Sequence, residues 1–131
     1  MPKYTFVYLR DPDSNGCCAA CVEHIKIDEN RTNLRIAFSF SSPDELQFEK
    51  KISRNMAIER MEAGKFILIE KRKGKSTYDT VRQYFINAAR ELEEDGSSAE
   101  SLFRIKPYKV GSISSLTSEF WGWLFYFSKR V

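Results

Sequence analysis

The stretch CCAACVEH, residues 17–24, holds all three cysteines and the only histidine of the 131-residue chain. Cys18 and Cys21 form a C-x-x-C pair, Cys17 stands next to it, and His24 follows three positions later. Thiolate sulfur and imidazole nitrogen are zinc ligands, and C-x-x-C is also a motif of thiol redox centres. The chemistry open to this segment is therefore metal binding or thiol exchange.

Both chemistries lack a part that they normally need. Zinc sites usually take two ligand pairs from separate turns, and no second pair exists anywhere in the sequence. A redox C-x-x-C normally opens a helix, whereas residues 21–28 read as a strand. We therefore expect small buried thiols, a structural or surface histidine and no cofactor. A metal- or thiol-dependent protein remains an alternative, and its ligands would be Cys17, Cys18, Cys21 and His24.

No other catalytic motif is complete. GKST at residues 74–77 resembles the end of a phosphate-binding loop, but the position of the earlier glycine holds Ile69. No motif singles out a pair of carboxylates for acid–base chemistry. We therefore predict that the chain is not an enzyme.

The basic residues form clusters that could attract an acidic partner. The net charge is only +3, and glutamates are interleaved with the cations, so the chain lacks the concentrated positive field of a committed nucleic-acid binder. One cluster occupies the loop after a short apolar strand, and a second lies on the helix before that strand. The predicted contact residues are Lys71, Arg72, Lys73 and Lys75 in the loop, with Lys51, Arg54 and Arg60 on the helix.

The segment 120–127 is apolar or aromatic except for Gly122. Glycine disfavours a helix interior and aromatic residues favour strands, so a strand is the preferred interpretation over a helix. Tryptophan side chains anchor many interfaces. Trp121 and Trp123 are therefore the predicted apolar anchors if the segment is exposed, and otherwise they belong to a strand that is covered on both faces.

Alternation of apolar and polar residues is clearest in residues 34–40, where Leu34, Ile36, Phe38 and Phe40 fall on one face. This pattern is typical of a half-buried strand, which would form a hairpin with the strand before it. Further strands are predicted at residues 3–10, 21–28, 65–70, 102–110 and 120–127.

Two helices are predicted, at about residues 43–63 and 76–95. In the first, Phe48, Ile52 and Met56 recur every four residues and mark the side expected to be buried. The second opens with a Ser-x-x-Asp capping box and has strong helical periodicity. Together these elements predict an α+β fold, in which two helices pack on a mainly antiparallel sheet of about five or six strands, within a single domain of residues 1–131.

Residues 38–64 resemble a pattern in small, mostly uncharacterised phage and prophage proteins, in which a strand and a turn precede a basic helix. The positions that match this pattern are Phe48, Lys50, Lys51, Arg54, Ala57 and Arg60. Such proteins commonly bind and block host machinery, including CRISPR effectors. The resemblance therefore implies a stoichiometric inhibitor.

The remaining sequence features limit the class of protein to which the chain can belong. No export signal precedes the first strand, no apolar run approaches a membrane span, and the odd cysteine count suits a reducing cytoplasm. We therefore predict a cytoplasmic, non-catalytic protein that docks on a host protein or ribonucleoprotein, as a monomer or homodimer and without membrane contact. Direct DNA or RNA binding is the alternative.

Overall fold

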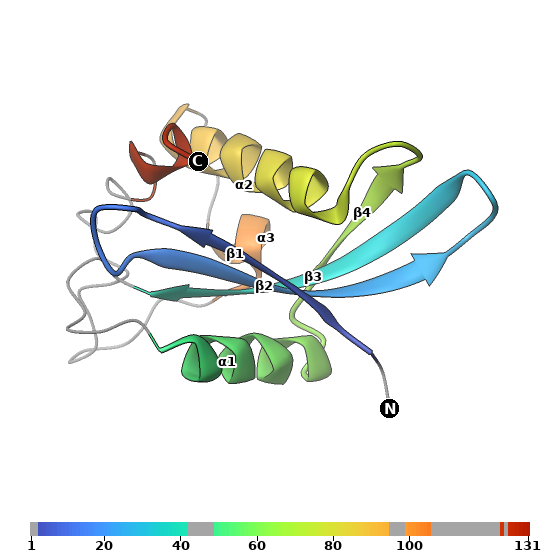
Figure 1. Cartoon of the computed structure of the whole chain (residues 1–131), viewed down its shortest axis with the longest axis horizontal. Helices are drawn as coiled ribbons and strands as arrows, with labels where there is room; N and C mark the ends of the chain where they lie inside the picture. The colour runs from blue at the N-terminus through green and yellow to red at the C-terminus, as the bar shows by residue number, and fades with distance from the viewer. Residues whose placement is uncertain (1–2, 42–48, 95–98, 106–123, 125) are drawn as a thin grey trace.

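A mainly antiparallel sheet with helices on both faces forms the described part of the chain (Figure 1). The computed structural model describes residues 3–41, 49–94, 99–105, 124 and 126–131. Within these ranges the elements are β1 (Thr5–Arg10), β2 (Cys17–Lys26), β3 (Arg31–Ser41), α1 (Lys50–Glu62), β4 (Ile67–Arg72), α2 (Thr77–Glu94) and α3 (Ala99–Phe103).

The four strands lie in chain order, β1-β2-β3-β4, and each pairs antiparallel with the next. Turn chemistry fixes the first connection, because the Asp11 carboxylate accepts hydrogen bonds from the Asp13 amide (3.0 Å) and the Ser14 hydroxyl (2.9 Å). At the turn between β2 and β3, the Asp28 carboxylate accepts the amide of Asn30 at 2.8 Å. Short turns of this kind favour antiparallel pairing of consecutive strands.

The larger core lies between the sheet and α2. Alternate residues of β2 and β3 point toward α2, and they meet Val81, Phe85 and Ala88 of that helix. The ring of Phe103 from α3 stands edge-on to Phe38, with 5.1 Å between the ring centroids. The residues that the sheet contributes to this core are Val7, Leu9, Cys18, Ala20, Val22, Leu34, Ile36 and Phe38.

The second, smaller core lies between the sheet and α1, on the opposite face (Figure 1). It is made largely of small side chains, with Cys21 and Ala37 of the sheet facing Ala57 of α1. Arg60 secures the helix, because its Nη1 donates to the carbonyl oxygen of Phe38 at 2.6 Å. Small residues on both sides let the helix and the sheet approach closely, which suits the small side chains that β2 places on this face.

The predicted α+β class is confirmed, but the strand count is wrong, since the described residues form four strands rather than five or six. Residues 102 and 103, predicted as the start of a strand, end helix α3. Of the predicted strand 120–127, the described residues 124, 126 and 127 are helical. Leu124 and Phe127, three positions apart, are buried, while Tyr126 is 60% exposed, and this is the periodicity of a helix. Because nearly every residue of the segment is apolar, the sequence does not show this period.

Helix α2 confirms its predicted position and cap, because the hydroxyl of Ser76 accepts the amide of Asp79 at 3.0 Å. The buried side predicted for the first helix is wrong. Ile52 is 53% exposed, and the buried residues of α1 are Ser53, Ala57 and Met61. The sheet face beneath α1 is built from small residues, so the helix turns its own small side chains toward it. The predicted start at residues 42–48 lies outside the described residues.

Two substitutions test this orientation of α1. Ile52→Ala should change the free energy of unfolding by no more than about 0.5 kcal/mol, because the side chain is largely in solvent. Ala57→Leu should destabilise the protein by about 1–3 kcal/mol, because the close contact with Cys21 and Ala37 has no room for the larger side chain. Urea unfolding followed by circular dichroism measures both. A large loss for Ile52→Ala with a neutral Ala57→Leu would contradict the orientation.

Candidate functional site

The structure disperses the cysteine–histidine segment over both faces of the sheet. All three cysteines lie in β2, whose alternation directs Cys18 into the α2 core and Cys17 and Cys21 toward α1. They are free and buried, and burial raises the pKa of Cys17 and of Cys21 to about 12 and that of Cys18 well above its ordinary value. In the described ranges no three histidine, cysteine or acidic side chains lie close enough to hold a metal ion.

His24 lies on the α2 side of the sheet, away from Cys21. Its Nε2 is 2.8 Å from the Thr77 hydroxyl oxygen, a contact that links β2 to the first residue of α2. Partial burial, followed by the nearby charge of Lys71, lowers the pKa of His24 below 6.5. The ring is therefore neutral at neutral pH, and its contact with Thr77 helps to position the turn that precedes α2.

The connection from β4 to α2 concentrates positive charge. We call Lys71, Arg72, Lys73 and Lys75 the cationic turn. A tight turn holds them together, because the Lys75 amide donates to the Arg72 carbonyl oxygen at 3.1 Å and Gly74 has a φ of +89°. Arg72, Lys73 and Lys75 are exposed and Lys71 is half-buried. Among the described residues, none of these four side chains forms an ion pair.

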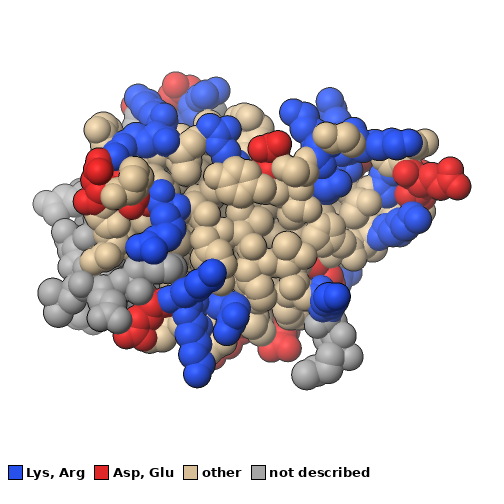
Figure 2. Space-filling view, viewed as in Figure 1, with Lys and Arg blue, Asp and Glu red and all other residues tan. Residues whose placement is uncertain are grey.

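The turn between β2 and β3 lies beside the cationic turn. Lys73 Nζ donates to Asn30 Oδ1 at 3.5 Å, and Ile27 is 48% exposed next to them. We call residues 23–35 and 67–75 together the basic end. It contains seven lysines and arginines against four aspartates and glutamates, an excess equal to the net charge of the whole chain. Figure 2 shows the blue side chains gathered at this end, with acidic side chains at the extreme tip.

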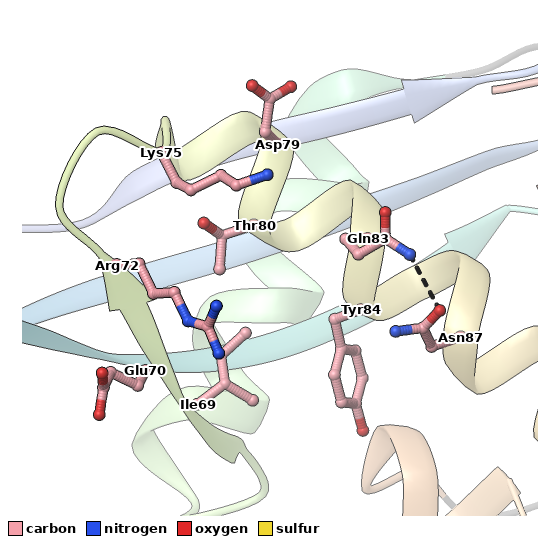
Figure 3. Close-up of a pocket in the computed structure, with 9 residues that line it drawn as sticks. All are labelled: Ile69, Glu70, Arg72, Lys75, Asp79, Thr80, Gln83, Tyr84 and Asn87. Atoms are coloured by element: carbon pink, nitrogen blue, oxygen red, sulfur yellow. Dashed lines mark hydrogen bonds between the residues drawn. The ribbon is translucent and has the colours of Figure 1, made fainter.

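A groove of about 340 Å³ runs between β4 and α2 (Figure 3). Arg72 and Lys75 reach into it from the strand side. Gln83 and Asn87, one helical turn apart on α2, line the other side, and Gln83 Nε2 donates to Asn87 Oδ1 at 2.9 Å. Tyr84 lines the groove as well, but its hydroxyl donates to the Leu102 carbonyl oxygen. The groove therefore combines two cations and two carboxylates, those of Glu70 and Asp79, with side-chain amides.

The cations predicted on the first helix do not join this surface, because α1 covers the opposite face of the sheet (Figure 1). Lys51 and Arg54 are exposed, and the Arg54 guanidinium lies 5.8 Å from the centre of the Phe6 ring. Arg60 instead donates to the main chain of β3, as described above. The structure thus separates the predicted contact residues into two surfaces and gives Arg60 a structural contact.

Sequence reasoning missed several exposed groups near the cationic turn. Leu68 is 59% exposed beside it, and Gln83 and Asn87 face the groove. The i, i+4 spacing of the two amides was readable, since such pairs share a helix face. Trp121 and Trp123, the predicted apolar anchors, lie outside the described residues.

In comparisons with family models, curated proteins and solved structures, nothing matched this chain. The similarity of residues 38–64 to phage proteins therefore stays a prediction. None of the helices in the described ranges has both the length and the apolar character that crossing a bilayer requires.

Gly74 offers a test of how the cationic turn is held. Gly74→Ala should destabilise the protein by about 1 kcal/mol, because an L-residue is strained at this positive φ although no atom lies within 4 Å of the added Cβ. Gly74→Asn should cost less, since asparagine tolerates the left-handed region. Thermal unfolding measures both, with Lys73→Ala as the matched control in the same turn. Equal stabilities for all three variants would contradict the strained turn.

The buried thiols predict a distinctive response to alkaline pH. A free thiol ionises near pH 9.0, whereas Cys21 in the folded protein has a pKa of about 12. Between these values the unfolded state binds fewer protons than the folded state, so the free energy of unfolding falls as pH rises, by up to about 1.4 kcal/mol per pH unit for each such thiol.

Urea unfolding across this range measures the slope, and Cys21→Ala should make it shallower because the variant lacks one of the titrating groups. A thiol reagent applied at mildly alkaline pH should leave the folded protein unlabelled and should label all three cysteines once urea unfolds it. Rapid labelling of the native protein would show that β2 is accessible and that this assignment is wrong.

Proposed function

We propose that this chain is a non-catalytic binding protein that docks on an acidic surface of a partner protein through its basic end. The observation that carries the proposal is the cationic turn, where a short main-chain turn brings together four positive side chains that lack ion-pair partners within the described residues. Charges left unpaired on a rigid element attract an oppositely charged surface and steer its approach.

The surroundings of the cationic turn favour a protein partner over nucleic acid. Leu68 and Ile27 expose large apolar side chains within the basic end, and exposed apolar atoms on a charged surface suit a protein interface. Asp28 and Glu29 lie at the tip of the same end, and this mixture of signs suits a protein surface, which carries both charges, better than a uniformly negative phosphate backbone. Direct binding of DNA or RNA is therefore the alternative, and the binding experiment described below distinguishes it.

The resemblance to phage proteins suggests the biological setting of such docking. A small protein that covers an acidic patch on host machinery, including a defence ribonucleoprotein such as a CRISPR effector, would inhibit it stoichiometrically and without catalysis. The structure weighs against the thiol-dependent alternative, because Cys18 and Cys21 lie in the two cores and His24 contacts Thr77.

Two triple variants of equal charge test the proposal. Lys71→Ala, Arg72→Ala and Lys73→Ala together should weaken binding of a fluorescent polyglutamate peptide about tenfold or more, because they remove the cations at the proposed contact. The matched control replaces Lys50, Lys51 and Arg54 with alanine and should retain affinity within about twofold, since all three lie on α1, on the opposite face of the sheet.

Fluorescence anisotropy at low and physiological salt measures both variants, and a single-stranded DNA oligonucleotide serves as the competing probe. Equal losses in the two variants would show that net charge alone binds the peptide, and the proposed docking surface would be wrong. Tighter binding of the DNA, with an affinity that falls steeply with salt and depends on the cationic turn, would replace the proposal with nucleic-acid binding.

A further inference from the structure

We propose that the partner contributes an extended acidic segment that pairs with β4 as an additional strand, with its side chains in the groove between β4 and α2. This inference rests on the proposed function and specifies how the partner is held. Addition of a strand to a sheet edge is a common mode of peptide recognition, in which main-chain hydrogen bonds supply affinity and side-chain pockets supply specificity.

The first support is the position of β4 in the sheet. Among the described strands β4 pairs only with β3, through the register Arg31↔Arg72 to Ile36↔Ile67. In an antiparallel ladder, alternate residues of an edge strand direct their N–H and C=O groups away from the neighbouring strand. Over the six residues of β4 this leaves a short row of donors and acceptors along the edge.

The second support is the surface on each side of this edge. Ile69 is half-buried and lines the groove, while the next side chain on the other face, Leu68, is 59% exposed. Side chains of an added strand would alternate between these two environments. Those on the groove side would meet the amides of Gln83 and Asn87, whose donors and acceptors suit carboxylates and main-chain groups.

The third support is charge. Two cations and two carboxylates line the groove, Arg72 and Lys75 with Glu70 and Asp79 (Figure 3). The excess of positive charge comes from Lys71 and Lys73, the other members of the cationic turn. β4 itself is apolar over its first three residues and ends in Lys71 and Arg72. A complementary segment therefore carries apolar residues against the beginning of β4 and acidic residues against its end.

The other described edge of the sheet is less suited to an incoming strand. On β1, Lys50 Nζ lies 4.6 Å from the centre of the Tyr8 ring, and Arg54 lies over Phe6. Near the end of β1, Arg130 pairs with Asp11 at 3.0 Å and also with Asp13. The side chains that flank β1 are therefore engaged with one another, while the cationic turn beside β4 has no ion pair among the described residues.

A set of synthetic peptides tests strand addition without altering the protein. The parent peptide has about ten residues, enough to span β4, with valine and threonine in the half that faces the apolar beginning of β4 and glutamate in the half that faces its basic end. One derivative carries N-methyl groups on every odd-numbered amide and another on every even-numbered amide, which keeps every charge and removes main-chain donors. Isothermal titration calorimetry measures the affinities, and hydrogen exchange of ¹⁵N-labelled protein follows the amides of residues 67–72.

Strand addition predicts one-to-one binding of the parent peptide, slower exchange of alternate β4 amides, and an affinity loss of about tenfold or more for at least one methylated derivative, because the donors that face β4 are lost. If both derivatives bind like the parent, charge alone holds the peptide, so strand addition is wrong while the docking surface stands. If neither these peptides nor polyglutamate binds, the proposed function fails as well. Concentration-dependent protection of β4 without peptide would show that a second copy occupies the edge and would overturn the inference.

Discussion

Close contact between α1 and the sheet through small side chains is the constraint on which the rest of the structure depends. From Cys17 to Val22, β2 is buried on both faces, because α2 covers one side and the cysteines and alanines leave room for α1 on the other. Beyond Val22 the burial of β2 becomes alternating and partial, and the strands project past both helices (Figure 1). The basic end exists because this coverage stops partway along the sheet.

An element of the fold could be predicted where its sequence signal involved only neighbouring residues. The hairpin of β2 and β3 and the position of α2 were predicted because alternation, a helix cap and a 3.6-residue period are properties of neighbouring residues. The orientation of α1 was not predictable in this way, because an exposed Ile52 makes sense only once the small-residue face of the sheet beneath the helix is known. The strand predicted at residues 120–127 was wrong for a related reason, since an apolar run hides its period and only tertiary contacts show that Leu124 and Phe127 face the core.

For the candidate site, too, the parts that could be predicted were those with a local sequence signal. The cationic turn was readable because its four members lie within five consecutive positions, whereas the groove joins β4 to the middle of α2 and has no contiguous signature. Whether Lys51, Arg54 and Arg60 share a surface with the turn stayed open, because sequence does not say which face of a sheet a helix covers. Local charge density can thus identify a cluster, but its separation from other clusters is set by topology.

Because its thiols lie on opposite faces of the sheet, β2 can report separately on the packing of α1 and of α2. Cys18 lies under α2, while Cys21 lies under α1 only three residues away. If either helix lifts off the sheet without global unfolding, it uncovers its own sulfur and leaves the other shielded. Variants that keep only Cys18 or only Cys21 would therefore distinguish local opening at α2 from local opening at α1.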